Sequence, residues 1–262
     1  MFFKLQPLIY SIFFLLSLEA VVLKENWVKS VAWLLIFLTV IVIWPLTRKP
    51  RFIALPFFLS LGSLGLLFLV DHIAEKQVFI FLATGVYYLT LLGGYRLRFC
   101  ITDQTALGMV NLATLSTVFL WFSAALGLYL NFQIKYWIMA VFVATIFFVS
   151  LPSFYTNAKD KEARLKKVGG KSQKTESITI IFLNLILVLI MVQFFWGIIF
   201  WPFGYLTLGG SALIIFYEFW DIIRLYTRGE LTVKRIVLNW SIGLILLFGI
   251  LSTAQWSLVS KI

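Results

Sequence analysis

The chain has 262 residues, of which 61% are apolar and only 13% are formally charged. A soluble domain carries about 25% charged residues, so this composition excludes a soluble globular protein, a disordered chain and a coiled coil. A single cysteine excludes an intrachain disulfide, and with it a secreted disulfide scaffold.

Nine apolar runs of roughly membrane-spanning length follow one another along the chain. A helix satisfies every backbone N–H and C=O group in hydrocarbon, whereas a β-barrel requires strands of alternating polarity, which the uniformly apolar residues 186–192 do not have. We therefore predict an all-α transmembrane helix bundle, forming a single integral membrane domain over residues 1–262. The predicted helices span residues 7–23, 31–46, 52–70, 78–95, 106–130, 136–155, 178–200, 203–223 and 236–256.

The first run loosely resembles a signal peptide, because Lys4 precedes an apolar stretch. Leu18 stands where a small residue is needed before a cleavage point, and Glu19 is unfavourable beside it. We therefore expect a retained first helix.

Lys and Arg residues are distributed unevenly between the two sides that nine helices define. Seventeen of the 22 fall at the N-terminus or in the even-numbered loops, and five fall on the other side. Because positively charged loops stay cytoplasmic, we predict an N-terminus inside and a C-terminus outside. Nine of the ten tryptophans lie near a predicted interface and only Trp121 lies mid-membrane, which agrees with this topology.

The longest polar segment, residues 156–177, is a basic loop on the predicted cytosolic side. Such loops attract the anionic lipids of the inner leaflet at ~1 kcal/mol per basic residue. Membrane lipid therefore accounts for the formal charge of +11 without a nucleic-acid partner. A solvated tether and a docking segment for a membrane protein partner both fit this loop.

Residues able to carry chemistry are few. The chain has one histidine, His72, and one cysteine, Cys100, whereas a zinc site needs three or four ligands and a serine triad needs a histidine beside its nucleophile. The sequence has no intramembrane-protease motif and no phosphate-binding glycine loop. We predict no catalytic centre, no metal and no cofactor.

Polar residues gather near the predicted inner boundary. At 100° per residue, the acids and arginines that end the eighth predicted helix share one arc of about 120°. We expect Glu218 or Asp221 to pair with an arginine at the end of the fourth helix. Three explanations of the cluster stay open: structural pairing between helices, a cavity or ligand site that faces the cytosol, and a subunit docking surface. Its members are Arg96, Arg98, Asn111, Asn184, Glu218, Asp221, Arg224, Arg228 and Asn239.

Small residues cluster on three predicted helices, at residues 60–65, 123–127 and 209–212, where they allow backbones to approach closely. Gly209 and Gly210 also permit bending, as does Pro56. Because no charged residue lies at mid-depth beside these clusters, we interpret them as packing sites rather than as helix breaks around a transport site.

Three segments near the C-terminus carry a resemblance to a known family: FGYLT at 203–207, RGELT at 228–232 and TAQW at 253–256. Over about its last quarter the chain resembles a family of polytopic inner-membrane proteins of small-genome bacteria. That family has no assigned activity, so the resemblance implies a location in a bacterial inner membrane and no function.

The scarcity of catalytic groups favours a non-enzymatic membrane subunit or scaffold. The polar layer also fits a transporter of small solutes or lipids with a cavity open to the cytosol. A third alternative is a lipid-modifying enzyme in which Glu218 or Asp221 acts as a base while Arg96 and Arg98 hold a phosphate group.

Overall fold

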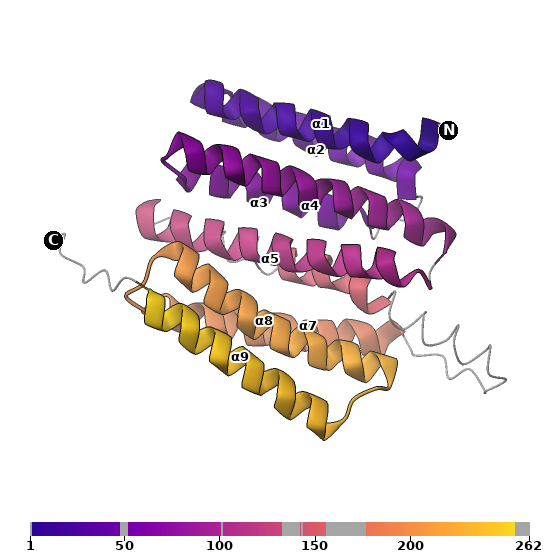
Figure 1. The fold of residues 1–262 in the computed structure, drawn as a ribbon, viewed down its shortest axis with the longest axis vertical. Helices are drawn as coiled ribbons and strands as arrows, with labels where there is room; N and C mark the ends of the chain where they lie inside the picture. Colours follow the sequence, from indigo (N-terminus) through magenta and orange to yellow (C-terminus); the bar gives the residue numbers. More distant parts are fainter. Residues whose placement is uncertain are drawn as a thin grey trace. The chain divides into compact units, whose positions relative to one another are not determined.

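The computed structural model describes residues 2–47, 52–100, 102–132, 142, 144–155 and 177–254. Over these residues the protein is all-helical, without a β-strand (Figure 1). The elements run in the order α1 (Phe2–Leu23), the short 3₁₀ helix η1 (Glu25–Trp27), α2 (Val28–Thr47), α3 (Ala54–Leu69), α4 (Ile73–Phe99), α5 (Gln104–Phe132), α7 (Ser177–Ile198), α8 (Tyr205–Arg228) and α9 (Val233–Thr253), with a further apolar helical segment, Ala144–Tyr155, before α7.

The prediction of an all-helical fold is confirmed, and a helix covers most of the described part of each predicted run. The sixth run begins in residues 136–141, which lie outside the described residues, as does nearly all of the predicted loop 156–177. The last two residues of the ninth run, 255 and 256, also lie outside them.

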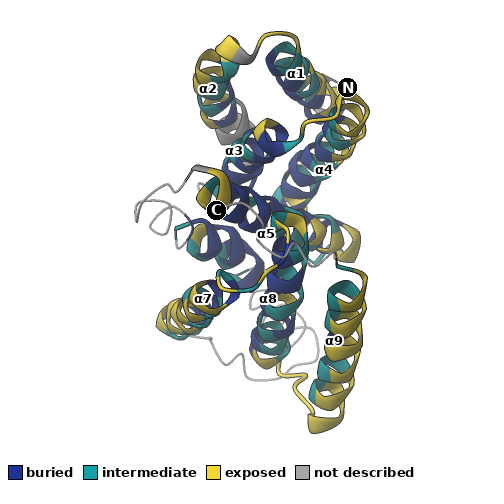
Figure 2. Ribbon diagram, turned by 90° about the vertical axis from the view of Figure 1, so that its left-hand side faces the viewer, coloured by how far each residue is buried: buried dark blue, intermediate teal, exposed yellow. Residues whose placement is uncertain are grey.

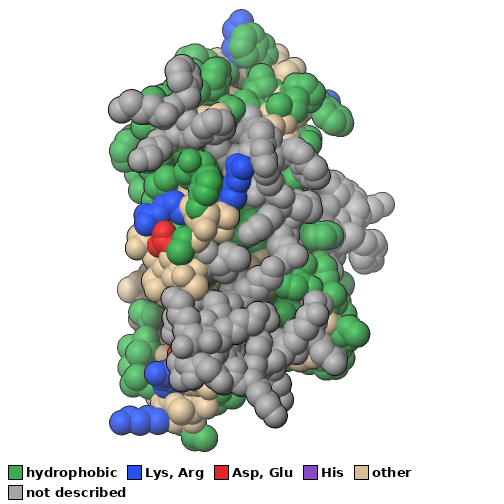
Figure 3. Space-filling model, turned by 90° about the vertical axis from the view of Figure 1, so that its right-hand side faces the viewer, with side chains coloured by type: hydrophobic (Ala, Val, Ile, Leu, Met, Phe, Trp, Pro, Cys, Tyr) green, Lys and Arg blue, Asp and Glu red, His purple; other side chains and the backbone are tan. Residues whose placement is uncertain are grey.

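Six helices are long and apolar enough to cross a membrane, which indicates a multi-pass membrane protein. These six are α1, α4, α5, α7, α8 and α9, and three shorter apolar helices accompany them, at Val28–Ile41, Ala54–Leu69 and Ala144–Tyr155. Hydrophobic side chains cover much of the described surface in the space-filling view, and Lys and Arg form only small groups there (Figure 3).

Many hydroxyl side chains inside the described helices bond to the backbone of their own helix. Ser60 Oγ donates to the carbonyl of Pro56 at 2.7 Å, and Thr117 Oγ1 donates to the carbonyl of Ala113 at 2.7 Å. Such a bond to the preceding turn satisfies a hydroxyl where no water is available. The helices can therefore carry serine and threonine at fully buried positions.

The chain forms two compact units, which divide within α5 between Trp121 and Phe122. In the first unit, α4 packs against α1, α2 and α3, and α2 also contacts α1 and α3. Phe14 stacks on Tyr87 with ring centroids 4.3 Å apart, which joins α1 to α4. Trp121 Nε1 donates to the Phe58 carbonyl at 2.6 Å, which joins α5 to α3. The prediction of a single membrane domain stays a prediction.

Small residues in the first unit permit close helix packing, as predicted for the cluster at residues 60–65. A Cβ atom added to Gly62 would meet the Trp121 ring at 3.0 Å, and one added to Gly93 would meet Met109 Cβ at 3.1 Å. Both glycines therefore lie where a neighbouring helix approaches closely.

In the second unit, α8 lies against both α7 and α9. A buried aromatic group joins three helical segments: Phe142 lies 4.5 Å from Phe122 of α5 and 4.6 Å from Phe195 of α7, measured between ring centroids. A Cβ atom added to Gly209 of α8 would clash with Ser123 of α5, so these backbones also approach closely.

The second unit is buried unevenly. Helix α8 combines buried and exposed faces, whereas α9 is exposed over most of its surface (Figure 2). Gly243 is the one buried residue within α9. Helix α9 contacts the rest of this unit mainly through α8, and the contact includes the aromatic pair Phe219 and Trp240, with ring centroids 5.6 Å apart.

Candidate functional site

The nine residues of the predicted cluster divide between the two units. Arg96 and Arg98 lie at the end of α4 and Asn111 lies in α5, all in the first unit. The other six lie in the second unit, and the structure brings several of them into contact. The expected ion pair between α4 and α8 would join the two units, and it stays a prediction. The members in the second unit are Asn184, Glu218, Asp221, Arg224, Arg228 and Asn239.

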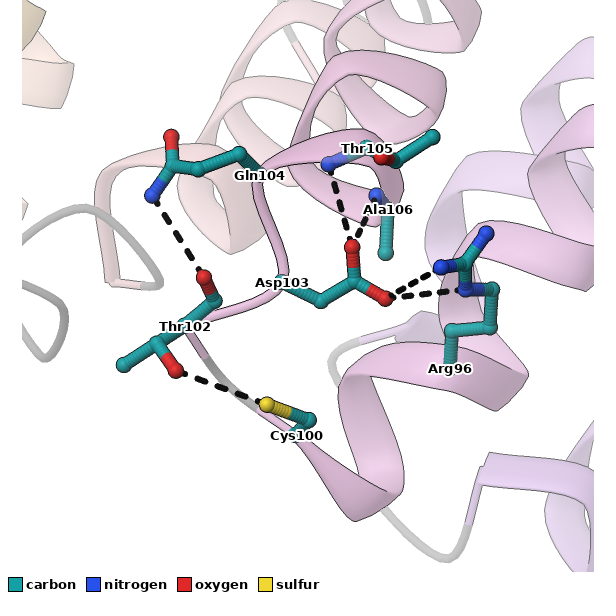
Figure 4. A network of polar contacts seen from close by, with 7 residues as sticks. All are labelled: Arg96, Cys100, Thr102, Asp103, Gln104, Thr105 and Ala106. Carbon is teal, nitrogen blue, oxygen red and sulfur yellow. Dashed lines mark hydrogen bonds and ion pairs between the residues drawn. The ribbon is translucent and has the colours of Figure 1, made fainter.

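Arg96 pairs with Asp103 across the corner between α4 and α5 (Figure 4). Asp103 Oδ2 lies 2.8 Å from both Arg96 Nε and Arg96 Nη2, while Oδ1 accepts the backbone N–H groups of Thr105 and Ala106 at 3.0 and 3.1 Å. Asp103 thus caps the N-terminus of α5 and neutralises the arginine that ends α4.

Sequence reasoning missed Asp103, although a signal for it existed. An aspartate immediately before an apolar helical run is a common N-cap, and its carboxylate has two oxygens to share. Arg98, the neighbouring arginine, lies with its guanidinium carbon 5.3 Å from the Phe99 ring centroid. The two arginines therefore have different surroundings.

Asn184 joins α7 to the segment Ala144–Tyr155. Its Nδ2 donates to the Phe147 carbonyl at 2.8 Å, and its Oδ1 accepts the Ser150 hydroxyl at 2.5 Å. Asn184 is fully buried, so both bonds form away from water, where an amide without partners would be costly. This member of the predicted cluster connects two helices.

Asp221 connects α8 to α9. Its Oδ2 accepts a hydrogen bond from Asn239 Nδ2 at 2.5 Å, and its Oδ1 lies 3.8 Å from Arg224 Nη1 on the next turn of α8. The Arg224 guanidinium in turn lies 5.4 Å from the ring centroid of Trp220. Asp221 and Arg224 therefore pair at i,i+3 on the polar arc of α8, and an amide from α9 adds a hydrogen bond to Asp221.

Glu218, one turn before Asp221, has different surroundings. Its side chain is buried, with 2% of the residue exposed. Its Oε2 atom has no hydrogen-bond partner among the described residues. Its carboxylate lies against Gly243 of α9, where an added Cβ atom would meet Glu218 Cδ at 2.9 Å and Cγ at 3.1 Å. The missing side chain of Gly243 makes the space that the carboxylate fills.

Glu218 and Asp221, which share one arc of α8, therefore have different surroundings. Asp221, Arg224 and Asn239 form a bonded network, and Glu218 extends this polar strip one turn further along the α8–α9 contact. Gly243 was missed in the sequence, because a glycine in a transmembrane run signals close approach without saying which side chain approaches.

The remaining candidates for chemistry are isolated. His72 precedes α4 and is exposed, and Cys100 follows α4 and is exposed, with its Sγ 3.4 Å from Thr102 Oγ1. Within the part of the chain that the structure describes, no three His, Cys, Asp or Glu residues gather in a group that could hold a metal ion.

Comparison with known proteins adds no assignment. No family model matches the chain, and no match is found among the curated proteins or the solved structures. The function must therefore be argued from the helices and the polar contacts themselves.

Proposed function

We propose that this protein is a non-enzymatic subunit of a membrane assembly, with nine membrane-spanning helices, in a bacterial inner membrane. One observation carries the proposal: most of the predicted site residues whose contacts are described bond to neighbouring helices. Arg96 bonds to Asp103, Asn184 to Ser150 and Phe147, and Asp221 to Asn239. Polar groups used in this way hold helices together.

Native mass spectrometry of the protein extracted in mild detergent tests the subunit role. We expect the chain to migrate with at least one other membrane protein in a fixed ratio that persists through two chromatography steps. A tagged multi-pass protein of similar size from the same cells is the control, and proteins that accompany both are discarded. A chain that emerges alone, with lipid only, contradicts the proposal.

The proposed topology places the N-terminus and the basic loop 156–177 in the cytosol, beside anionic inner-leaflet lipid, and the C-terminus outside. Single cysteines replace Ser172 or Ser260 in a Cys100→Ser background. A membrane-impermeant maleimide should label the Ser260→Cys variant in intact cells and the Ser172→Cys variant only after permeabilisation. Equal labelling of both variants contradicts a nine-span arrangement.

A transporter is the second candidate, because one observation favours it. Glu218 lies in a helix long enough to cross a membrane, and its buried carboxylate has one oxygen with no hydrogen-bond partner among the described residues. Ionisable groups in such helices are costly to insert, and they mark ion and proton pathways in many transporters.

A lipid-modifying enzyme is the third alternative, and it is tested by assaying lipid turnover with the purified protein. Turnover that disappears in the double variant Glu218→Gln, Asp221→Asn would support the enzyme instead.

A further inference from the structure

Two carboxylates and one described cation share the buried strip between α8 and α9. Asp221 has the cation, Arg224, and a hydrogen-bond donor, Asn239. Among the described residues, no cation pairs with Glu218, and no donor bonds to its Oε2 atom. If both acids were ionised, the described residues of this strip would hold one uncompensated negative charge, in a helix long enough to cross a membrane.

The basic residues on α8 and α9 lie too far along their helices to compensate Glu218. At 1.5 Å per residue, Arg224 lies about 9 Å further along α8 and already faces Asp221, and Arg228 lies about 15 Å further. On α9, Lys234 and Arg235 lie about 12 to 14 Å from Gly243, and Arg235 pairs with Glu230 at 3.2 Å.

The other described elements of this unit bring no charge to Glu218. Helix α7 contains no ionisable residue. Residues 122–132 of α5 contain one tyrosine, Tyr129, and the segment Ala144–Tyr155 contains one, Tyr155. On α8 itself the adjacent titratable group is Tyr217. Among the described residues, an ionised Glu218 would have no counter-ion and its Oε2 atom no donor, and burial of such a charge is strongly unfavourable.

We propose that Glu218 is a proton-binding site within the membrane: its carboxyl group is held against Gly243 in the neutral, protonated form and exchanges its proton through Asp221. The exchange breaks one O–H bond on Glu218 and forms one on Asp221. Asp221 lies three residues further along α8, closer to the loop that connects α8 to α9. Asp221 then becomes neutral and Glu218 carries the negative charge, until the proton passes from Asp221 to water and Glu218 takes up another proton. This inference rests on membrane insertion of α8 and not on the subunit role.

A hydrophobic carbodiimide tests the proposal, because it reacts with protonated carboxyl groups inside membranes and leaves a stable adduct. In native membranes at neutral pH, dicyclohexylcarbodiimide should modify Glu218, as mapped by mass spectrometry of the digested protein. Glu230, whose exposed carboxylate pairs with Arg235, is the internal control and should stay unmodified. The Glu218→Gln variant should gain no adduct on α8.

The pH dependence separates a proton from a metal cation as the occupant. Above the midpoint of its titration, the labelling rate of Glu218 should fall about tenfold per pH unit. Sodium or potassium at constant ionic strength should leave the rate unchanged. Protection by one of these cations shows a cation site and overturns the proton assignment, as does absence of the adduct from Glu218 at every pH.

Removal of the neighbouring charge provides an independent readout on the same carboxyl group. In an Asp221→Asn variant, ionisation of Glu218 no longer places two negative charges one turn apart, so the fall in labelling should begin at lower pH. A labelling profile identical to that of the wild type would show that the two carboxyl groups are not electrostatically coupled, which contradicts a proton exchange between them. The labelling assay does not depend on assembly with other proteins, so it can fail or succeed independently of the subunit proposal.

Discussion

The corner between α4 and α5 and the hairpin of α8 and α9 both place acids beside arginines at helix ends, yet their carboxylates differ. At the corner, both oxygens of Asp103 have donors, from Arg96 and from two backbone N–H groups. In the hairpin, Asp221 has partners and Glu218 Oε2 has none among the described residues. The comparison teaches that donors, rather than charge or depth alone, distinguish a structural acid from a candidate functional one.

The two regions also differ in how much of their charged side chains is exposed to solvent. At the corner, 41% of the Arg96 side chain and 18% of the Asp103 side chain are exposed, and exposed ion pairs contribute about 0 to 1 kcal/mol. In the hairpin, 12% of the Asp221 side chain is exposed. Removal of one charge should therefore lower the free energy of unfolding more in the hairpin than at the corner, because water replaces the lost contacts less readily there.

The largest effect is expected from Asp221→Ala. The substitution leaves the Asn239 amide without an acceptor and Arg224 without its counter-ion, so the free energy of unfolding should fall by about 2 to 3 kcal/mol. The measurement is unfolding of the purified protein in mixed micelles titrated with a denaturing detergent. Glu218→Gln is the matched variant and should change stability by less than about 0.5 kcal/mol near neutral pH, because an amide resembles a neutral acid. Equal losses in both variants would remove the distinction between the two acids.

Gly243→Ala comes next. The added Cβ atom meets Glu218 Cδ and Cγ at 2.9 and 3.1 Å, so either the carboxyl group or α9 must move. Overpacking of this kind costs about 1 to 3 kcal/mol. Gly249→Ala on the same helix is the control, since its Cβ atom meets nothing within 4 Å. Thermal denaturation in detergent should separate the two variants, and a harmless Gly243→Ala would show that α9 is not seated on Glu218.

Asp103→Ala should destabilise the protein by about 1 to 2 kcal/mol, because it removes the N-cap of α5 together with the Arg96 ion pair. Asp103→Asn keeps an oxygen for the backbone N–H groups and loses only the charge. It should therefore cost less than about 1 kcal/mol. Measured in the same detergent titration, an equal loss for Asp103→Asn and Asp103→Ala would contradict this expectation and show that the ion pair, rather than the cap, dominates this corner.

The helices were predictable from the sequence because hydrocarbon permits few alternatives to a helix. The ends of the helices were not predictable, since an apolar run shows where hydrophobic residues stop, whereas a helix ends where its backbone hydrogen bonds stop. Helix α4 was expected to end at residue 95, yet it continues through two arginines to Phe99. Helix α8 was expected to end at residue 223 and continues to Arg228, where Gly229 terminates it.

The polar face of α8 was also predictable, because helical periodicity places Asp221 and Arg224 together. The partners from other helices were not predictable, since they depend on how two helices face each other. Asn239 was singled out for its depth alone, and its bond to Asp221 follows from the antiparallel register of α8 and α9. The place of Glu218 against Gly243 depends on the same register.

The smallest effect is expected at the end of α8, where the two regions differ in backbone rather than in charge. Gly229 has a φ of 72° and ψ of 24°, in the left-handed region, and the N–H groups of Gly229 and Glu230 close the helix on the carbonyls of Tyr226 and Leu225 at 3.0 Å each. Helix α4 ends instead in an extended residue, Cys100, with φ of −135°.

Gly229→Ala should therefore cost about 1 kcal/mol, because a Cβ atom disfavours left-handed backbone. Gly229→Asn should cost less, since asparagine tolerates this conformation better than alanine, while Cys100→Ala at the end of α4 should show no backbone penalty. Unfolding in mixed micelles measures all three. If Gly229→Ala is neutral, the turn between α8 and α9 does not depend on a left-handed residue, and the register that seats Glu218 on Gly243 must be fixed by the Asp221–Asn239 bond instead.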